Sequence, residues 1–263
     1  DQWPLTEEKL NQLNLLVDRE IAAGHLIHST GPWNCPVFLI KKKSGTWRFL
    51  HDLRAVNVVL EDMGQLQPGM PWPSVLPDSW PMAVIDIKDC FFSIPLHPDD
   101  SKRFAMTIPT VNNAAPARRL QWTVLLQGMK NSPTLCQFYV SCALQEFREA
   151  PRDWVVYHYM DDIIISGREG VEQAVEQLTA ALQNWGLIVA PEKVQLQTPV
   201  QYLGTLVERT TIKPQKLTIT KEVHNLHDVQ ILVGNLQWLR QFIPITHKEL
   251  GPLIIDLVGP PDL

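Results

Sequence analysis

Residues 154–167, "WVVYHYMDDIIISG", place Asp161 and Asp162 between two runs of β-branched and aromatic residues. Such runs predict two strands, with the acidic pair at the turn of a hairpin. One interpretation is ordinary surface chemistry, because Asp is common in turns, where its side chain bonds its own backbone. The other is chemical, since like-charged carboxylates on a rigid apolar ribbon repel each other unless a cation lies between them. The chemical interpretation requires a third carboxylate from another part of the chain.

The segment "AVIDIKDCFFSIPL", residues 83–96, supplies that carboxylate. Asp86 ends a buried type of strand, where an acid is costly unless it is paired or binds metal. Asp89 could instead cap a helix that follows. If the strand and the hairpin are neighbours, Asp86 and Asp161 could face each other, with Asp162 more peripheral, because successive strand residues point to opposite faces. Carboxylates around two divalent cations, roughly 3.5 to 4 Å apart, support in-line phosphoryl transfer.

Hydrophobic periodicity predicts the elements that must position these acids. Leucine and valine at helical spacing predict an amphipathic helix over residues 6–23, with Thr6 as its cap and Gly24 as its stop. Residues 36–54 predict two strands joined by a Ser44-Gly45 turn. Five prolines make residues 61–81 a connecting segment. Short apolar runs predict further strands at residues 82–87, 103–108 and 119–125.

The second half of the chain alternates between helical and strand patterns. Ser132-Pro133 is a plausible cap and first turn of a helix that runs over residues 131–150. An apolar stripe predicts a second helix over residues 169–185. Strands are expected at 186–190, 200–208 and 210–214, and helices from Asp228 to the end. This order predicts an α+β fold, with helices packed on one face of a sheet.

Composition sets the class of protein. The chain has 263 residues, 45% of them hydrophobic, which is enough for a well-buried core in one large domain or two to three subdomains. We find no apolar run of membrane-spanning length and no signal-peptide pattern at the start, so we expect a soluble protein with no membrane partner. The four cysteines lack metal-binding spacing, which favours buried, reduced thiols and an intracellular, reducing location.

Charge is unevenly distributed along the sequence. The net charge of -5 argues mildly against a nucleic-acid partner. Residues 37–54, however, carry five basic residues and one acid, and residues 101–145 carry five basic residues and no acid. These two basic tracts could form one positive groove for nucleic acid, or they could be two solvated faces.

Several motifs, in order, resemble those of retroviral reverse transcriptases. They are Tyr159-Met160-Asp161-Asp162, "DIKDCFFSIPL", "LLQGMKNSP" at 125–133, "PEKVQ" at 191–195 and "YLG" at 202–204. The resemblance covers essentially the whole chain. The segments "HDLRAVN", "NNAAPARR" and "DVQILVGNLQWLR" make it similar to alpha- and betaretroviral or endogenous retroviral Pol sequences.

The resemblance implies a right-hand polymerase fold. Residues 1–85 would form the fingers and the start of the palm, 86–213 the palm with a finger insertion near 95–125, and 214–263 the thumb. The family's connection and RNase H domains would follow the thumb, so we expect a fragment of a longer, multifunctional Pol polyprotein. The implied location is the cytoplasm or the virion core.

The resemblance also implies the site residues and partners. Asp86, Asp161 and Asp162, with the Ile87 carbonyl, would hold two Mg2+ ions, for which Mn2+ could substitute, and Lys193 would protonate the leaving pyrophosphate. The nucleotide contacts would be Lys42, Arg48, Phe91, Gln127, Gly128 and Met160. The primer and template contacts would be Tyr159, Tyr202, Leu203 and Gly204. The partners would be an RNA or DNA template with its primer, deoxynucleoside triphosphates and, in some assemblies, a second Pol-derived subunit as a dimer.

The roles of single residues have ordinary alternatives. Phe91 would lie under the 2′ carbon of the sugar and exclude a hydroxyl, which argues against an RNA-dependent RNA polymerase, but it could also be a core residue beside Phe92. Lys193 could be a solvated surface lysine. For the whole chain, the alternative is a catalytically silent, nucleic-acid-binding subunit or a decayed endogenous copy. A calcium-binding module is disfavoured, because no segment gathers enough oxygen donors.

Overall fold

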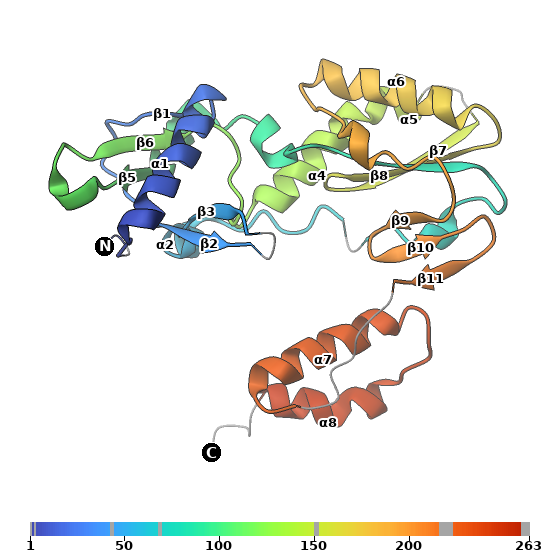
Figure 1. The fold of residues 1–263 in the computed structure, drawn as a ribbon. Coiled ribbons are helices and arrows are strands. Elements are labelled where there is room, and N and C mark those ends of the chain that lie inside the picture. The colour runs from blue at the N-terminus through green and yellow to red at the C-terminus, as the bar shows by residue number, and fades with distance from the viewer. Residues whose placement is uncertain are drawn as a thin grey trace.

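The computed structural model describes residues 2, 4–42, 45–67, 70–149, 153–215 and 223–258. Lys43 and Ser44, part of the expected turn and basic tract, lie outside the described residues. The described chain contains helices and antiparallel sheets arranged as two lobes and a separate helix pair (Figure 1). Within the described residues, no helix combines the length and apolar character needed to cross a membrane.

The first lobe holds two small sheets beside the opening helix. Helix α1 (Glu7–Ala22) is capped by the Thr6 hydroxyl, which accepts a hydrogen bond from the Lys9 amide at 3.3 Å, as the sequence predicts. A three-stranded antiparallel sheet has the order β1 (Leu26–His28), β6 (Arg118–Trp122), β5 (Ala105–Ile108). A hairpin of β2 (Val37–Lys41) and β3 (Trp47–His51) lies beside it, followed by α2 (Arg54–Val59).

The second lobe is built on the sheet that carries the acids. Its order is β4 (Met82–Asp86), β8 (Asp162–Gly167), β7 (Trp154–Tyr159), all antiparallel. Ala83 and Ile85 of β4 face the larger core, where helices α4 (Ser132–Ala143) and α6 (Val171–Asn184) contact the sheet. Met82 and Val84 face a smaller core. Because both faces are covered, these strands read as continuous apolar runs.

A second small sheet covers that other face. It has the order β11 (Ile212–Pro214), β10 (Thr205–Val207), β9 (Val200–Tyr202), and β9 contacts β4. The single strand predicted over 200–208 was therefore wrong, because Leu203 and Gly204 adopt positive φ and turn the chain between β9 and β10. The strand predicted over 186–190 was also wrong. It contributes only the isolated bridge between Ile87 and Val189.

The helix predicted over residues 131–150 is interrupted. Helix α4 ends at Ala143 and a short α5 (Gln145–Glu149) follows. Asn131 holds the cap position instead of Ser132, whose hydroxyl donates to the Leu126 carbonyl at 2.7 Å. Asp89 makes no capping bond, since its backbone is left-handed where a short 3-10 turn begins. The remaining short helices are η1 (Pro73–Val75), η2 (Cys90–Ser93), α3 (Pro98–Ser101), η3 (Lys102–Phe104), η4 (Val111–Asn113) and η5 (Pro191–Lys193).

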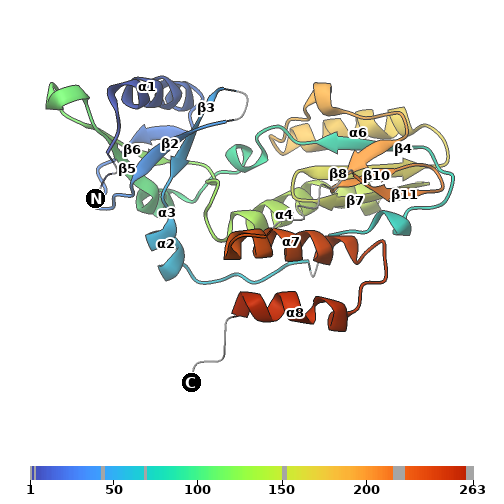
Figure 2. The same cartoon turned by 60° about the horizontal axis from the view of Figure 1, so that its bottom comes forward.

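The helix pair follows the small sheet. Helix α7 (Leu226–Leu239) begins with a capping box between Asn225 and Asp228. Helix α8 (His247–Val258) packs along it, as the turned view shows (Figure 2). A side chain on Gly204 would lie 3.4 Å from the ring of Trp238, so α7 rests against the turn between β9 and β10. Phe242 packs edge-on against Trp72 at 5.2 Å, which ties the pair to the connecting segment.

Candidate active site

The register of the second-lobe sheet brings the three predicted acids together. Strand β7 pairs with β8 so that Tyr159 lies opposite Asp162, and β4 pairs with β8 so that Asp86 also lies opposite Asp162. Asp161 lies in the two-residue turn, where its carbonyl accepts the Ile87 amide at 3.0 Å. The turn therefore ties the end of β4 to the hairpin.

This register corrects the expected pairing. The sequence predicted that Asp86 faces Asp161, with Asp162 peripheral, but the turn includes Met160 and Asp161, so the ladder begins at Asp162. In β4 and β8, Met82, Val84 and Ile164 face the smaller core. Alternation puts Asp86 and Asp162 on that same face, at the open end of the sheet.

The three acids interact electrostatically. Burial, together with the charges of Asp161 and Asp86, raises the pKa of Asp162 to about 6, while Lys193 opposes the shift. Burial also raises the pKa of Asp161, with a contribution from Asp86. Burial is the largest cause of both shifts, and repulsion from the neighbouring carboxylates adds to it.

Lys193 lies at the same site. Its ammonium contacts a carboxylate oxygen of Asp86 at 2.7 Å, with 57% of the lysine side chain and 20% of the aspartate side chain exposed. Lys193 is therefore a solvent-exposed surface lysine that is also paired with Asp86. Lys193 lies in the short turn η5, 107 positions after Asp86 in the sequence, and places a positive charge beside the acids.

The acids suit a hard cation by their chemistry. Within the described parts of the chain, no three Asp, Glu, His or Cys side chains stand close enough, as placed, to hold one metal ion. The donors at the strand end are nevertheless all carboxylate oxygens, two of them with raised pKa, and Lys193 is the cation paired with them. Oxygen ligands of this type are those that Mg2+ prefers. A divalent cation would offset both the cost of burying their charges and the repulsion between them.

Met160 occupies a strained backbone position next to Asp161. Its φ of 54° is left-handed, which a non-glycine residue adopts only when its surroundings require it. The Met160 amide donates to the side-chain oxygen of Gln137 at 2.6 Å, and the Gln137 amide donates to Gln67. Helix α4 therefore holds the turn that carries Asp161.

A buried histidine supports the same helix. The His158 Nε2 lies 3.1 Å from the Gln137 carbonyl and its Nδ1 lies 2.7 Å from the Arg148 guanidinium. Since Arg148 can only donate, Nδ1 accepts and Nε2 carries the proton. Burial, with a smaller contribution from the Arg148 charge, lowers the pKa of His158 to about 4. Sequence reasoning missed this support, because a histidine inside an apolar strand resembles any core residue.

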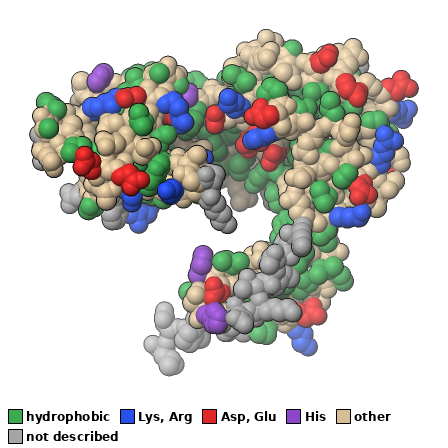
Figure 3. Space-filling model, in the orientation of Figure 1, with side chains coloured by type: hydrophobic (Ala, Val, Ile, Leu, Met, Phe, Trp, Pro, Cys, Tyr) green, Lys and Arg blue, Asp and Glu red, His purple; other side chains and the backbone are tan. Residues whose placement is uncertain are grey.

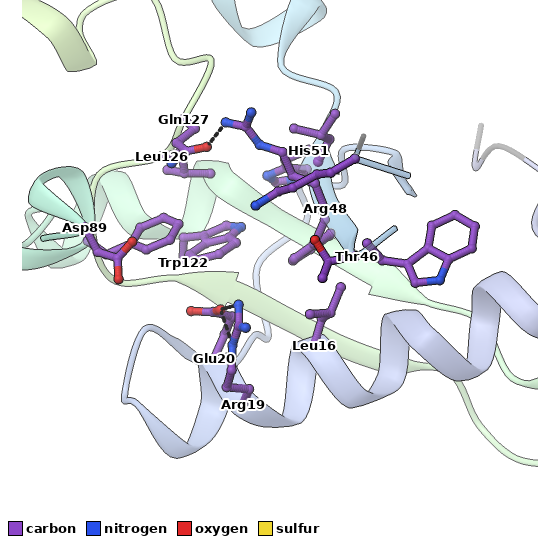
Figure 4. Close-up of a pocket in the computed structure, with 15 residues that line it drawn as sticks. Leu16, Arg19, Glu20, Thr46, Arg48, His51, Asp89, Trp122, Leu126 and Gln127 are labelled. Atoms are coloured by element: carbon purple, nitrogen blue, oxygen red, sulfur yellow. Dashed lines mark hydrogen bonds and ion pairs between the residues drawn. The ribbon is translucent and has the colours of Figure 1, made fainter. Parts of the chain in front are cut away.

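The first lobe contains a second candidate subsite, a cavity of about 350 Å³. Lys42, Arg48 and Gln127, all predicted nucleotide contacts, line it, and the Arg48 guanidinium donates to the Gln127 side chain (Figure 4). Asp89 and Glu20 also line it. The lining thus combines three cations, Arg19, Lys42 and Arg48, with two acids, and its cationic and amide groups can bind an anionic, hydrogen-bonding ligand.

Two other predicted nucleotide contacts, Gly128 and Phe91, do not line this cavity but adjoin the lining residues Gln127 and Phe92 in the sequence. Gly128 has a φ of 92°, a backbone conformation that glycine adopts most readily. No atom lies within 4 Å of the position that a side chain would take, so the backbone conformation, not a lack of space, favours glycine here. Phe91 is half-buried against the core, whereas Phe92 lines the cavity and stacks on Trp122 at 5.4 Å. The sequence offered both phenylalanines and had no spacing signal to identify Phe92 as the cavity residue.

The predicted primer contacts differ in accessibility. Tyr202 is only 2% exposed, and its hydroxyl has no hydrogen-bond partner among the described residues. Burial raises the pKa of Tyr202, and the charge of Asp162 adds to that shift. Leu203 and Gly204 form the adjoining turn at half-buried and exposed positions. Tyr159 ends β7 at a half-buried position. Only the turn residues and Tyr159 are therefore open to a ligand.

The two basic tracts do not behave alike. In the second tract, Arg119 donates to the carbonyls of Gly31 and Trp33, Arg118 pairs with Asp18 at 2.6 Å, and Lys130 donates to Leu60. These side chains hold the first lobe together. The first tract contributes Lys42 and Arg48 to the cavity. These contacts do not support the prediction that both tracts line one groove.

The face shown in Figure 3 is hollowed between the two lobes and the helix pair. Acidic and basic side chains gather where the second lobe borders this hollow. Charged side chains of both signs therefore border the hollow.

Comparisons with known proteins identify relatives. A family model described as reverse transcriptase (RNA-dependent DNA polymerase) matches residues 40–207. The chain is 50% identical over its whole length to the Gag-Pro-Pol polyprotein of Mason-Pfizer monkey virus, covering 15% of that protein. It is 48% identical over 98% of its length to that of mouse mammary tumor virus (strain BR6), again 15% of the relative. It is 47% identical over its whole length to the Intracisternal A-particle Pol-related polyprotein of mouse intracisternal a-particle MIA14, covering 31% of it.

Proposed function

Because the chain belongs to the reverse transcriptase family of RNA-directed DNA polymerases, which are nucleotidyltransferases, we propose that it adds deoxynucleotides to a primer 3′ end. The template would be RNA or DNA, and the chain would work within a longer Pol polyprotein, of which it spans less than a third. The reaction is attack of the primer hydroxyl on the α-phosphorus of a deoxynucleoside triphosphate, with release of pyrophosphate.

The observation that carries the proposal is the register at the strand end. It sets Asp86 opposite Asp162 and places Asp161 in the adjoining turn, so three carboxylates from two distant segments share one edge of the sheet. Plain turn chemistry would explain Asp161 and Asp162 but gives no reason for Asp86 at the end of a buried strand.

Asp86, Asp161 and Asp162, with the carbonyl of Ile87, would hold two divalent cations, Mg2+ or in its place Mn2+. When bound, the ions supply charge stabilisation to the attacking and leaving oxygens. Lys193 neutralises Asp86 in the structure and would lie beside the triphosphate; its role as proton donor to pyrophosphate stays a prediction. Gln137 and Met160 would keep Asp161 in place.

Lys42 and Arg48 would hold the triphosphate, and Gln127 and Gly128 the sugar. Phe91 would exclude a 2′ hydroxyl, with Phe92 anchoring its short turn on Trp122. We assign residues 1–85 to the fingers with the start of the palm, 86–213 to the palm with a finger insertion near 95–125, and 214–263 to the thumb. We propose that the duplex lies in the hollow between these parts. Leu203 and Gly204 would meet the primer end. A dimer with a second Pol-derived subunit and a place in the cytoplasm or virion core complete the proposal.

The first test is primer extension on a poly(rA)/oligo(dT) substrate with dTTP, in Mg2+, in Mn2+ and in EDTA. We expect metal-dependent extension that an Asp161→Asn variant reduces by about a thousandfold or more, because a ligand to the reacting centre is lost. An Asp153→Asn variant, at an exposed acid outside the site, is the matched control.

The alternative is a silent subunit that binds nucleic acid. Duplex binding with no extension in either metal by a folded chain would favour it. Equal extension by the Asp161→Asn variant would contradict the assignment of the acids.

A further inference from the structure

Two buried thiols meet beneath the catalytic acids. The sulfur of Cys90 lies 3.1 Å from the sulfur of Cys136, and the two residues are 3% and 0% exposed. They are 46 positions apart in the sequence, so their spacing gave no sign of a pair. Among the described residues, the other cysteines, Cys35 and Cys142, make no contact of this kind with a thiol.

The contact is close to covalent range. A disulfide has a bond length of about 2.05 Å, so the sulfurs need approach by only about 1 Å. The hydrogen bond with Cys136 raises the pKa of Cys90, and burial raises it further. Cys90 therefore starts as a neutral thiol, and its oxidation is slow compared with that of an exposed thiolate.

Each thiol lies next to a residue of the proposed site. Cys90 opens η2, four positions after Asp86 and directly before Phe91. Cys136 lies on α4, directly before Gln137, whose side chain accepts the Met160 amide. A covalent link between them would join the segment that follows one catalytic strand to the helix that holds the hairpin turn.

We propose that Cys90 and Cys136 form an oxidative modification site, at which a peroxide converts the thiol pair to an intramolecular disulfide that impairs the site. One thiol loses its proton and its sulfur attacks a peroxide oxygen. The O–O bond breaks, water is released, and the sulfur becomes a sulfenic acid. The second thiol attacks that sulfur, the S–O bond breaks, and a second water leaves. Two thiols are oxidised and one hydrogen peroxide is reduced to two waters.

The chemical test needs no enzyme activity. The folded chain is treated with hydrogen peroxide, its remaining thiols are alkylated under denaturing conditions, and its peptides are mapped by mass spectrometry. We expect one linked peptide pair, Cys90 with Cys136, a loss of about 2 Da per chain and full alkylation of Cys142. Dithiothreitol should restore both alkylation sites. Cys90→Ala and Cys136→Ala should each abolish the link, and Cys142→Ala should leave it intact.

A second arm tests the consequence and rests on the proposed function. Closure by about 1 Å beside reacting groups is expected to lower kcat/KM for dTTP by roughly 10- to 100-fold, reversibly by dithiothreitol. Cys90→Ala should resist this loss, while Cys142→Ala should show it in full.

The outcomes separate the two proposals. A reduced chain without polymerase activity that still forms the linked peptide would count against the proposed function and leave the disulfide standing. Linkage of other cysteines, or sulfinic acid at Cys90 without a link, would overturn the modification site. A fully linked chain with unchanged kcat/KM would overturn its effect on the site.

Discussion

At the scale of single residues, the support behind the hairpin that carries Asp161 and Asp162 depends on the protonation of one histidine. His158 accepts from Arg148 and donates to the Gln137 carbonyl, and Gln137 in turn holds the Met160 amide. A protonated ring would lose its acceptor and place a second positive charge beside the guanidinium. The neutral form therefore stabilises the hairpin.

The contribution of His158 to the free energy of unfolding should accordingly fall in mild acid, whereas the raised pKa of Asp162 acts in the opposite direction. The folded-state pKa of His158 is about 4, below the unfolded value of about 6.5, so the unfolded state binds the extra proton first. Its contribution, about 3 kcal/mol, is fully present above pH 6.5 and is lost as the pH falls toward 4. His51, whose pKa burial also lowers to about 4, acts in the same window.

His158→Gln should remove about half of this pH dependence, because glutamine does not titrate and His51 supplies the other half. The glutamine amide can still accept a hydrogen bond from Arg148 and donate one to the Gln137 carbonyl. Urea unfolding at several pH values between 4 and 7.5 measures it. The exposed His28→Gln is the control. If His158→Gln keeps the full acid sensitivity, the assignment of the neutral ring is wrong.

Tyr202 offers a second prediction, which tests its expected contact with the primer. Its hydroxyl is buried without a hydrogen-bond partner among the described residues, so the folded state loses the hydration of that group. Tyr202→Phe should therefore raise the free energy of unfolding by about 1 kcal/mol and leave primer extension unchanged. Denaturant unfolding and steady-state extension check both. A large loss of extension with unchanged stability would show that the hydroxyl contacts the primer.

At the scale of elements, prediction succeeded where periodicity and capping act locally. The helix at α1 with its Thr6 cap, the β2–β3 hairpin and the strand that ends at Asp86 were confirmed, since each depends on neighbouring residues. The pairing of Asp86 was predicted wrongly, because the turn takes in Asp161, so that Asp162 is the acid that enters the ladder. The contact between Cys90 and Cys136 could not be predicted either, because packing between distant elements creates it.

Two substitutions in and beside helix α7 should have opposite effects on its stability. Asn225 and Asp228 form its capping box, so Asn225→Ala should destabilise the helix by about 1 kcal/mol. Gly234 is exposed inside the same helix, with no atom within 4 Å of the position that an added methyl group would take, so Gly234→Ala should stabilise it by about 0.5 to 1 kcal/mol. Hydrogen exchange of α7 amides should speed up in the first variant and slow down in the second. Changes of the same sign would contradict the argument.

At the scale of the whole molecule, the basic residues divide between structure and ligand. The chain is acidic overall, with a net charge of -5, and the sequence could not tell which cations are already engaged. Arg119 is half-buried and bonded to the carbonyls of Gly31 and Trp33, so it joins separate segments of the first lobe. Lys42 faces the cavity with Arg48 and Gln127. Counting charge along the sequence overestimated the surface available to nucleic acid.

This division predicts that two charge-removing variants fail in different ways. Arg119→Gln should lower the free energy of unfolding by about 1 to 2 kcal/mol, since the half-buried Gly31 carbonyl and the exposed Trp33 carbonyl lose a charged donor. It should leave the KM for dTTP unchanged in the folded fraction. Lys42→Ala should leave stability within about 0.5 kcal/mol and raise that KM by about tenfold, because a charge-assisted contact to phosphate is lost. Urea unfolding and steady-state kinetics of both variants measure the two effects. If Arg119→Gln raised the KM without loss of stability, the second tract would be a ligand surface after all, and the separation of roles would fail.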